Sequence, residues 1–139
     1  MLSEILSEKQ VHTDQDSLQY WGKDWTNGFD VAPSAVVFPE TIEQLQDLVR
    51  YAISAGVMLV PSGGRTGLSG GAVASNGEVV VSFDRMNQIL EFSEQDRIVT
   101  CQPGVITATL QDFAQQRGLF YPVDFASSGS SQIGGNVST

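Results

Sequence analysis

The chain has 139 residues, of which 41% are hydrophobic, and a formal net charge of −9. This length suffices for one domain that buries roughly two-thirds of its unfolded surface, and a mean hydropathy near zero excludes a disordered chain. The acidic charge argues against a nucleic-acid partner, because nucleic-acid binding depends on basic patches.

The sequence also argues against a membrane span, a secretory signal and histidine-based sites. No apolar run approaches the roughly 20 residues of a membrane span, and the charged first residues lack the apolar stretch of a secretory signal, so we expect a cytoplasmic protein. His12 is the single histidine, which excludes a His-based triad or a His-rich metal site; we expect no metal. Cys101 lies in an alternating run and is predicted to be a buried structural thiol.

The first 34 residues predict short helical turns and loops, at residues 3–10 and 17–20. Residues 21–28 are aromatic and then turn-rich, and predict a loop whose tryptophans, Trp21 and Trp25, cover the edge of the core. We therefore treat residues 1–34 as an N-terminal segment and residues 35–139 as the N-terminal portion of a domain.

A βαβ unit is predicted next. Residues 35–38 form an apolar run typical of a buried strand, as do residues 57–60. Between them, Thr41 and Gln44 match a capping box and Gly56 matches a left-handed helix end. The apolar positions expected on one face of this helix are Ile42, Leu45, Leu48, Val49, Ala52 and Ile53.

The later elements complete an α+β fold with a small mixed sheet. Residues 79–83 predict another strand, and residues 89–92 and 98–101 predict a hairpin. Thr107 is expected to cap a second helix that closes at Gly118. We expect the βαβ unit, the hairpin and this helix to share one core.

A glycine-rich loop, residues 61–73, follows the strand at residues 57–60. Its glycines are Gly63, Gly64, Gly67, Gly70 and Gly71. Glycine lets successive N–H groups line an anion-binding concavity, and hydroxyls and Arg65 add donors. The spacing fits neither a Walker A loop nor a G-x-G-x-x-G motif. The alternative is a flexible surface loop, although ligands of α/β proteins bind at strand ends.

Residues 121–139 form a second stretch rich in glycine and hydroxyls, which also suits the polar groups of a ligand. Its alternative is a disordered tail. Since a domain seldom ends on a Gly-Gly-Asn loop, we expect the chain to be the N-terminal part of a longer protein.

Together these motifs resemble a known family. Residues 61–72 resemble the pyrophosphate loop of FAD-linked oxidases and dehydrogenases of the vanillyl-alcohol oxidase/p-cresol methylhydroxylase superfamily, and Tyr121-Pro122 with residues 133–136 resemble its second flavin-binding stretch. Residues 21–25 are most similar to the D-lactate and D-2-hydroxyglutarate dehydrogenase branch. The resemblance implies the N-terminal half of a p-cresol-methylhydroxylase-type FAD-binding domain.

The resemblance also implies an activity and a site. The parent enzyme would oxidise a small D-2-hydroxy acid such as lactate, glycolate or 2-hydroxyglutarate, with hydride transfer to FAD; catalytic residues and any metal would lie outside this chain. The residues implied around FAD are Ser62, Gly63, Gly64, Arg65, Thr66, Gly67, Leu68 and Ser69 in the first loop, and Pro122, Ser127, Ser128, Gly134, Gly135, Asn136 and Ser138 in the second stretch.

Three further expectations accompany this interpretation. The first loop contains no histidine or cysteine of the kind that some relatives use to attach FAD covalently, so non-covalent binding is expected. Gly67 is expected to require a positive φ. The chain alone is expected to be inactive, to bind FAD poorly and either to self-associate through exposed apolar surface or to have a mobile tail at residues 127–139. The competing hypothesis is a non-catalytic module that binds another phosphate or nucleotide ligand.

Overall fold

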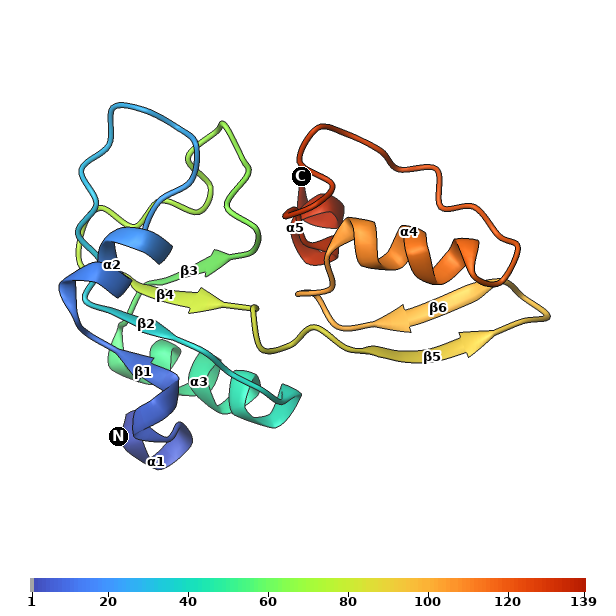
Figure 1. Ribbon diagram of the computed structural model, residues 1–139. Helices are drawn as coiled ribbons and strands as arrows, with labels where there is room; N and C mark the ends of the chain where they lie inside the picture. Colours follow the sequence, from blue (N-terminus) through green and yellow to red (C-terminus); the bar gives the residue numbers. More distant parts are fainter. Residues whose placement is uncertain (1) are drawn as a thin grey trace.

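The computed structural model describes residues 2–139 and shows two lobes joined by a short turn (Figure 1). The first lobe, residues 2–83, contains α1 (Leu2–Ile5), η1 (Glu8–Gln10), β1 (Val11–His12), α2 (Gln15–Trp21), β2 (Ala35–Val37), α3 (Ile42–Ala55), β3 (Leu59–Ser62) and β4 (Val79–Ser82). The second lobe, residues 88–139, contains β5 (Ile89–Ser93), β6 (Ile98–Cys101), α4 (Thr107–Gln115) and α5 (Ile133–Ser138). None of the helices within residues 2–139 is long and apolar enough to cross a membrane.

The first lobe is built on a four-stranded sheet with the order β1-β2-β4-β3. Strands β2 and β3 both run parallel to β4, which lies between them, and β1 pairs antiparallel with β2. The predicted βαβ unit is therefore present, with a later strand inserted between its two strands. The strand expected at residues 57–60 begins only at Leu59 and lies at the sheet edge, which leaves Met58 55% exposed.

Helix α3 has the predicted ends. The Thr41 hydroxyl accepts a hydrogen bond from the Gln44 N–H at 3.2 Å, and Gly56 closes the helix with φ 67°. The buried face is narrower than the apolar pattern predicted. Leu48 and Ala52 are buried and Leu45 packs against the core, whereas three other members of the pattern are exposed: Ile42, Val49 and Ile53.

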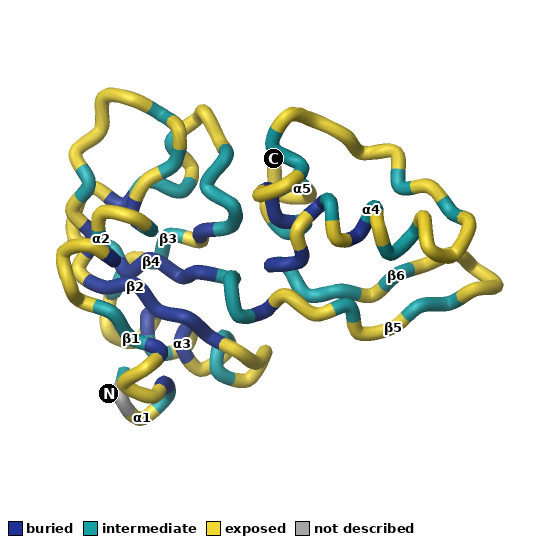
Figure 2. Tube along the Cα trace, in the orientation of Figure 1, coloured by how far each residue is buried: buried dark blue, intermediate teal, exposed yellow. Residues whose placement is uncertain are grey.

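Alternation along the central strands separates two apolar clusters. Val37, Val79 and Val81 contribute to one cluster together with Leu48 of α3, while Val36 and Val80 contribute to the other. Because successive strand residues point to opposite faces, α3 covers one face of the sheet. Leu18 and Trp21 of α2 pack against the other. Figure 2 shows the resulting band of buried residues through β2 and β4.

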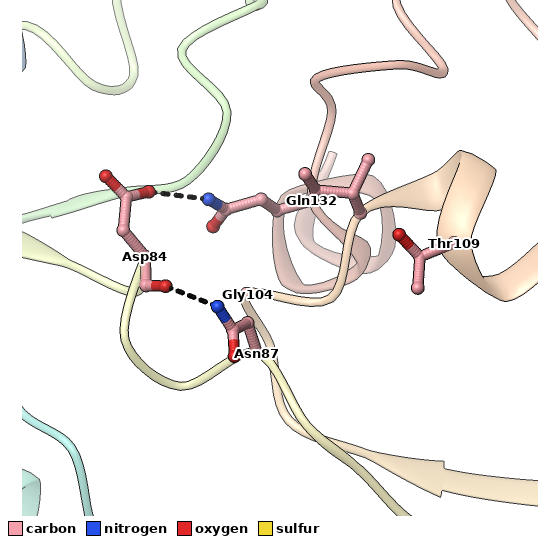
Figure 3. Close-up of a pocket in the computed structure, with 6 residues that line it drawn as sticks. Asp84, Asn87, Gly104, Thr109 and Gln132 are labelled. Carbon is pink, nitrogen blue, oxygen red and sulfur yellow. Dashed lines mark hydrogen bonds between the residues drawn. The ribbon is translucent and has the colours of Figure 1, made fainter.

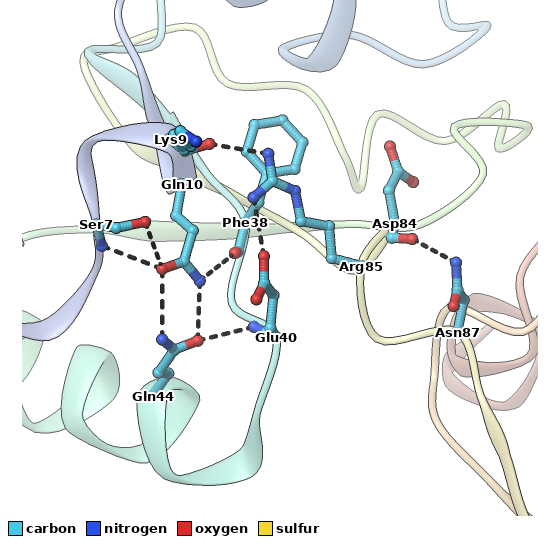
Figure 4. Close-up of polar contacts among 9 residues, drawn as sticks. All are labelled: Ser7, Lys9, Gln10, Phe38, Glu40, Gln44, Asp84, Arg85 and Asn87. Atoms are coloured by element: carbon cyan, nitrogen blue, oxygen red, sulfur yellow. Dashed lines mark hydrogen bonds and ion pairs between the residues drawn. The ribbon is translucent and has the colours of Figure 1, made fainter.

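The N-terminal segment is fastened to this sheet by polar contacts (Figure 4). The buried Gln10 amide donates to the Phe38 carbonyl at 3.0 Å and to the Gln44 side chain at 2.9 Å. Arg85, in the turn between the lobes, donates to the Lys9 carbonyl at 2.8 Å. Leu6 also lies in the core. The boundary at residue 34 stays a prediction, but residues on its two sides are in close contact.

The hairpin and α4 form a smaller second lobe. Phe92 of β5 and Phe113 of α4 meet edge to face with ring centroids 5.7 Å apart, and the Arg117 guanidinium lies 3.5 Å from the Phe113 ring centroid. These residues do not join the two clusters of the first lobe. The expectation of a single shared core is therefore wrong, because the hairpin lies outside the four-stranded sheet.

Two local predictions in the second lobe are also wrong. The N-cap of α4 is Ile106; Thr107 is the first helical residue, is fully buried, and hydrogen-bonds to Ser131. The chain end is not a loop, because residues 133–138 form α5. This short helix is held by tertiary contacts, among them an Asn136 side-chain hydrogen bond to the Thr107 hydroxyl at 2.7 Å.

The packing of α3 yields a stability prediction. Leu48→Ala removes a fully buried side chain and should lower the free energy of unfolding by about 2–5 kcal/mol. Ile53→Ala on the same helix removes a side chain that is 79% exposed and should change it by less than about 0.5 kcal/mol. Urea unfolding of both variants measures the difference; equal losses would contradict the assignment of the buried face.

Candidate functional site

The first loop is the part of the glycine-rich segment that holds the candidate ligands, residues 62–69. It begins at Ser62, the last residue of edge strand β3. Among the described residues, none accepts a hydrogen bond from the backbone N–H groups of residues 63–69, whereas the next N–H, that of Gly70, donates to the Thr26 hydroxyl at 2.8 Å. Consecutive backbone N–H groups without a partner in the protein commonly form an anion-binding site. The loop therefore offers a run of donors to a ligand at the end of a parallel strand.

The Arg65 side chain is engaged by other residues of the chain. Its backbone has φ 57°, a conformation that few residues other than glycine adopt readily. Its guanidinium lies 4.5 Å from the Tyr20 ring centroid, 3.9 Å from the Asp84 carboxylate and 3.4 Å from the Gly63 carbonyl. With the guanidinium engaged in this way, the backbone N–H groups are the free donors of the loop.

Residues 22–27 hold the first loop through two hydrogen bonds. The Trp25 N–H donates to the Gly67 carbonyl at 3.1 Å, and Thr26 accepts from Gly70. The expectation that Gly67 needs a positive φ is wrong; in this part of the chain Arg65 and Gly70 have that conformation instead. Trp25 is 71% exposed and does not cover the core edge as predicted, whereas Trp21 does pack against the core.

Two buried polar side-chain atoms near the loop have no hydrogen-bond partner within residues 2–139. They are the Ser62 hydroxyl oxygen and the Gln132 side-chain oxygen, on residues that are 0% and 6% exposed. A Cβ placed on Gly63 would lie 3.5 Å from that Gln132 oxygen. Since buried polar groups are nearly always hydrogen-bonded, these atoms indicate a place where a ligand or an ordered water completes the structure.

The two lobes touch at Gly64. A Cβ added there would lie 2.1 Å from the Ser130 carbonyl oxygen and 2.9 Å from the Ser131 Cα. No side chain fits such a gap, so glycine is required here by close approach and not by a positive φ. This contact brings the first loop and the second stretch side by side, as the resemblance to a two-part cofactor site implies.

Asp84 connects the same parts through its side chain (Figure 3). One carboxylate oxygen accepts from the Gln132 side-chain amide at 2.7 Å, and the other accepts from the Trp21 indole N–H at 2.8 Å. It also faces Arg65. No local pattern marks Asp84 or Gln132, because the partners of Asp84 lie 63 and 48 positions away in the chain.

Two open pockets flank these contacts. One, of about 570 Å³, lies beside the first loop and is lined by residues that include Tyr20, Lys23, Thr66 and Ser130. The other, of about 380 Å³, lies between the lobes and is lined by Asp84, Asn87, Gly104, Ile106, Thr109 and Gln132 (Figure 3). An extended ligand can therefore contact both lobes at this junction.

Several candidate residues of the second stretch make hydrogen bonds within the second lobe and do not present these groups to a ligand. The Gly134 N–H donates to the Pro103 carbonyl, and a Cβ on Gly134 would lie 2.6 Å from the Pro103 side chain. The Asn136 amide binds Thr107, and the Ser138 hydroxyl binds the Gly134 carbonyl.

The remaining candidates divide into two groups. The Ser127 and Ser128 carbonyls accept backbone hydrogen bonds from residues 130, 131 and 108, which fixes the approach to α5. Pro122 and Gly135 are exposed. The structure therefore does not place the whole second stretch against the first loop; the contact is made by residues 130–132.

Among the described residues, no three or more His, Cys, Asp or Glu side chains are grouped so as to hold a metal ion. Burial raises the pKa of the Cys101 thiol, which disfavours the reactive thiolate.

Comparison with known proteins gives close relatives. The chain is 65% identical over 138 residues to a D-2-hydroxyglutarate dehydrogenase of Stutzerimonas stutzeri (strain A1501), covering 99% of this chain and 30% of that protein. It is 36% identical to the mitochondrial D-2-hydroxyglutarate dehydrogenase of Arabidopsis thaliana, covering 98% of this chain and 24% of that protein. The chain thus spans less than a third of the length of these relatives.

Solved structures share the fold. An alkyldihydroxyacetonephosphate synthase matches with a TM-score of 0.90 at 21% identity, over 99% of this chain and 28% of that one. A p-cresol methylhydroxylase matches with a TM-score of 0.77 at 22% identity, over 94% of this chain and 26% of that one. The model of the FAD binding domain family matches residues 33–139. The chain belongs to this family of FAD-binding domains, with the α+β fold of the p-cresol methylhydroxylase type.

Proposed function

We propose that the first loop binds the pyrophosphate of FAD, mainly through the backbone N–H groups of residues 63–69. The observation that carries this proposal is the run of unpaired donors at the end of β3. A diphosphate accepts several hydrogen bonds from such a run without needing a cation. The unpartnered Ser62 hydroxyl adds a further donor at the start of the loop.

The second stretch is proposed to lie along the flavin end of the cofactor, beginning at the contact between Gly64 and Ser130. In this arrangement Gly134 and Asn136 act by shaping α5, while Ser127, Ser128 and Gly135 border the ligand. Binding is proposed to be non-covalent, which the absence of histidine and cysteine from residues 62–69 supports. When bound, FAD supplies the acceptor for a hydride.

For the protein that carries this chain, we propose the oxidation of a D-2-hydroxy acid. Two relatives that bear the name D-2-hydroxyglutarate dehydrogenase, at 65% and 36% identity, favour 2-hydroxyglutarate over lactate or glycolate. The described residues would bind and orient the cofactor. A cytoplasmic location stays a prediction.

Self-association is a further proposal. Its support is the exposure of large apolar side chains on both lobes, such as Leu68 at 75%, Phe120 at 86% and Val137 at 82%. Exposed apolar surface of this kind favours association. Measuring the molar mass of the purified chain in solution tests it, and a monomer at high concentration would contradict it.

The Gly64 contact yields a test of the cofactor site. Gly64→Ala forces a methyl group against the Ser130 carbonyl, and overpacking of this kind costs about 1–3 kcal/mol. In the longer protein that carries this chain, we expect FAD affinity to fall by about ten- to a hundredfold, measured by flavin fluorescence titration. The matched control is Gly71→Ala, which adds the same methyl group in open space and should bind FAD normally. Equal affinities in the two variants would refute the placement of the site.

The substrate proposal is tested by dye reduction in the protein that carries this chain, loaded with FAD. D-2-hydroxyglutarate should reduce the dye faster than D-lactate, glycolate or any L-enantiomer. A yellow protein with a flavin spectrum that reduces the dye with none of these acids would overturn the substrate class while leaving the cofactor proposal intact. A colourless protein stabilised only by another nucleotide would favour the non-catalytic module instead.

A further inference from the structure

Asp84 stands where the two lobes and the first loop converge. It lies just after β4, separated from Ser82 by Phe83, in the turn that leads to the second lobe. Its two carboxylate oxygens accept from opposite sides, one from Trp21 in the first lobe and the other from Gln132 in the second, at 2.8 and 2.7 Å. Arg65 of the first loop lies 3.9 Å away. None of these groups neighbours Asp84 in sequence.

We propose that Asp84 is a positioning residue of the cofactor site, which holds the first loop and residues 130–132 in their mutual arrangement. The inference rests on the proposed FAD site, but its geometry belongs to this chain alone. Asp84 acts through Gln132 and Arg65 and need not touch the cofactor.

The chemistry requires a carboxylate at this position. Trp21 and Gln132 both present N–H donors, and Arg65 presents a cation, so the residue between them must accept twice and carry negative charge. An asparagine of the same shape has only one acceptor oxygen. With its oxygen facing Trp21, its amide nitrogen would face Gln132, whose amide must turn over to accept from it. That turn moves the Gln132 oxygen away from the first loop.

Asp84 also sets the direction of the Gln132 amide. Because the nitrogen of that amide donates to Asp84, its oxygen is the free end, and this oxygen is the buried atom without a partner near Gly63. The acceptor is therefore presented beside the first loop by the hydrogen bond to Asp84. On the other side, the Arg65 guanidinium lies 3.9 Å from the carboxylate and over the Tyr20 and Trp21 rings, with centroids at 4.5 and 5.8 Å.

A reciprocal exchange of the two side chains, made in the longer protein that carries this chain, tests the proposal. Asp84→Asn turns an acceptor into a donor and forces the Gln132 amide to turn over, and Gln132→Glu sets two carboxylates against each other. Each single variant should weaken FAD binding about tenfold or more. The double variant, Asp84→Asn with Gln132→Glu, restores the hydrogen bond with its direction reversed and keeps the total charge of the pair. It should recover most of the lost affinity.

Two readouts accompany the affinity. Hydrogen exchange without FAD should quicken at the hydrogen-bonded amides of Trp25 and Gly70, which hold the first loop, and in residues 130–136 of each single variant. It should return towards the wild-type rate in the double variant. The thermal unfolding midpoint shows whether each variant is folded. Asp112→Asn on α4 removes an exposed carboxylate and serves as the matched charge control, with unchanged affinity and exchange.

The outcomes separate the two proposals. If the longer protein that carries this chain does not bind FAD in its wild-type form, the proposed function fails, but the exchange pattern still tests the positioning role. If FAD binds and the single variants match the Asp112→Asn control in affinity and exchange, the positioning role is overturned. Single variants that lose affinity without rescue in the double variant would also overturn it, because the effect would then not pass through the Asp84–Gln132 pair.

Discussion

The position of β4 is the constraint on which the rest of the structure depends. This strand is buried along its length and pairs with parallel neighbours on both sides, β2 and β3. Parallel strands end at the same edge of a sheet, so the first loop at the end of β3 and the turn at the end of β4 emerge together. Asp84 and Arg65 can meet for this reason alone. The candidate site is thus a consequence of strand order and not of proximity in the sequence.

The junction of the lobes depends on backbone contacts that leave no room for side chains. A Cβ on Gly104 would lie 2.0 Å from the Phe83 carbonyl oxygen, and one on Gly64 would lie 2.1 Å from the Ser130 carbonyl oxygen. These glycines allow the turn and the second stretch to approach the first lobe closely. Interiors packed in this way transmit small displacements, so a change at the turn should be felt at both loops.

The sequence predicts features whose causes are local and misses those whose causes are distant. The ends of α3 follow from Thr41 and Gly56, because capping depends on neighbouring backbone. The glycine-rich loop is likewise predictable, because its composition is a local property of the sequence. Helix α5 was missed, since two adjacent glycines disfavour a helix by about 1 kcal/mol each and only packing on Pro103 and Thr107 compensates. The local pattern predicts Thr107 as a cap, whereas its hydroxyl pairs with Ser131, which lies 24 positions away and leaves no local signal.

The charge of the chain bears on how such a site holds an anion. With a formal net charge of −9, the molecule repels a diphosphate at long range. A cation in the loop would offset this, but the Arg65 guanidinium is shared with Asp84 and the Tyr20 ring. The attraction must therefore come from short-range donors. Backbone N–H groups meet this need, because their dipoles are fixed by the fold and carry no counter-charge that must also be placed. An acidic domain can hold an anionic cofactor in this way, provided that the loop geometry is kept by contacts elsewhere.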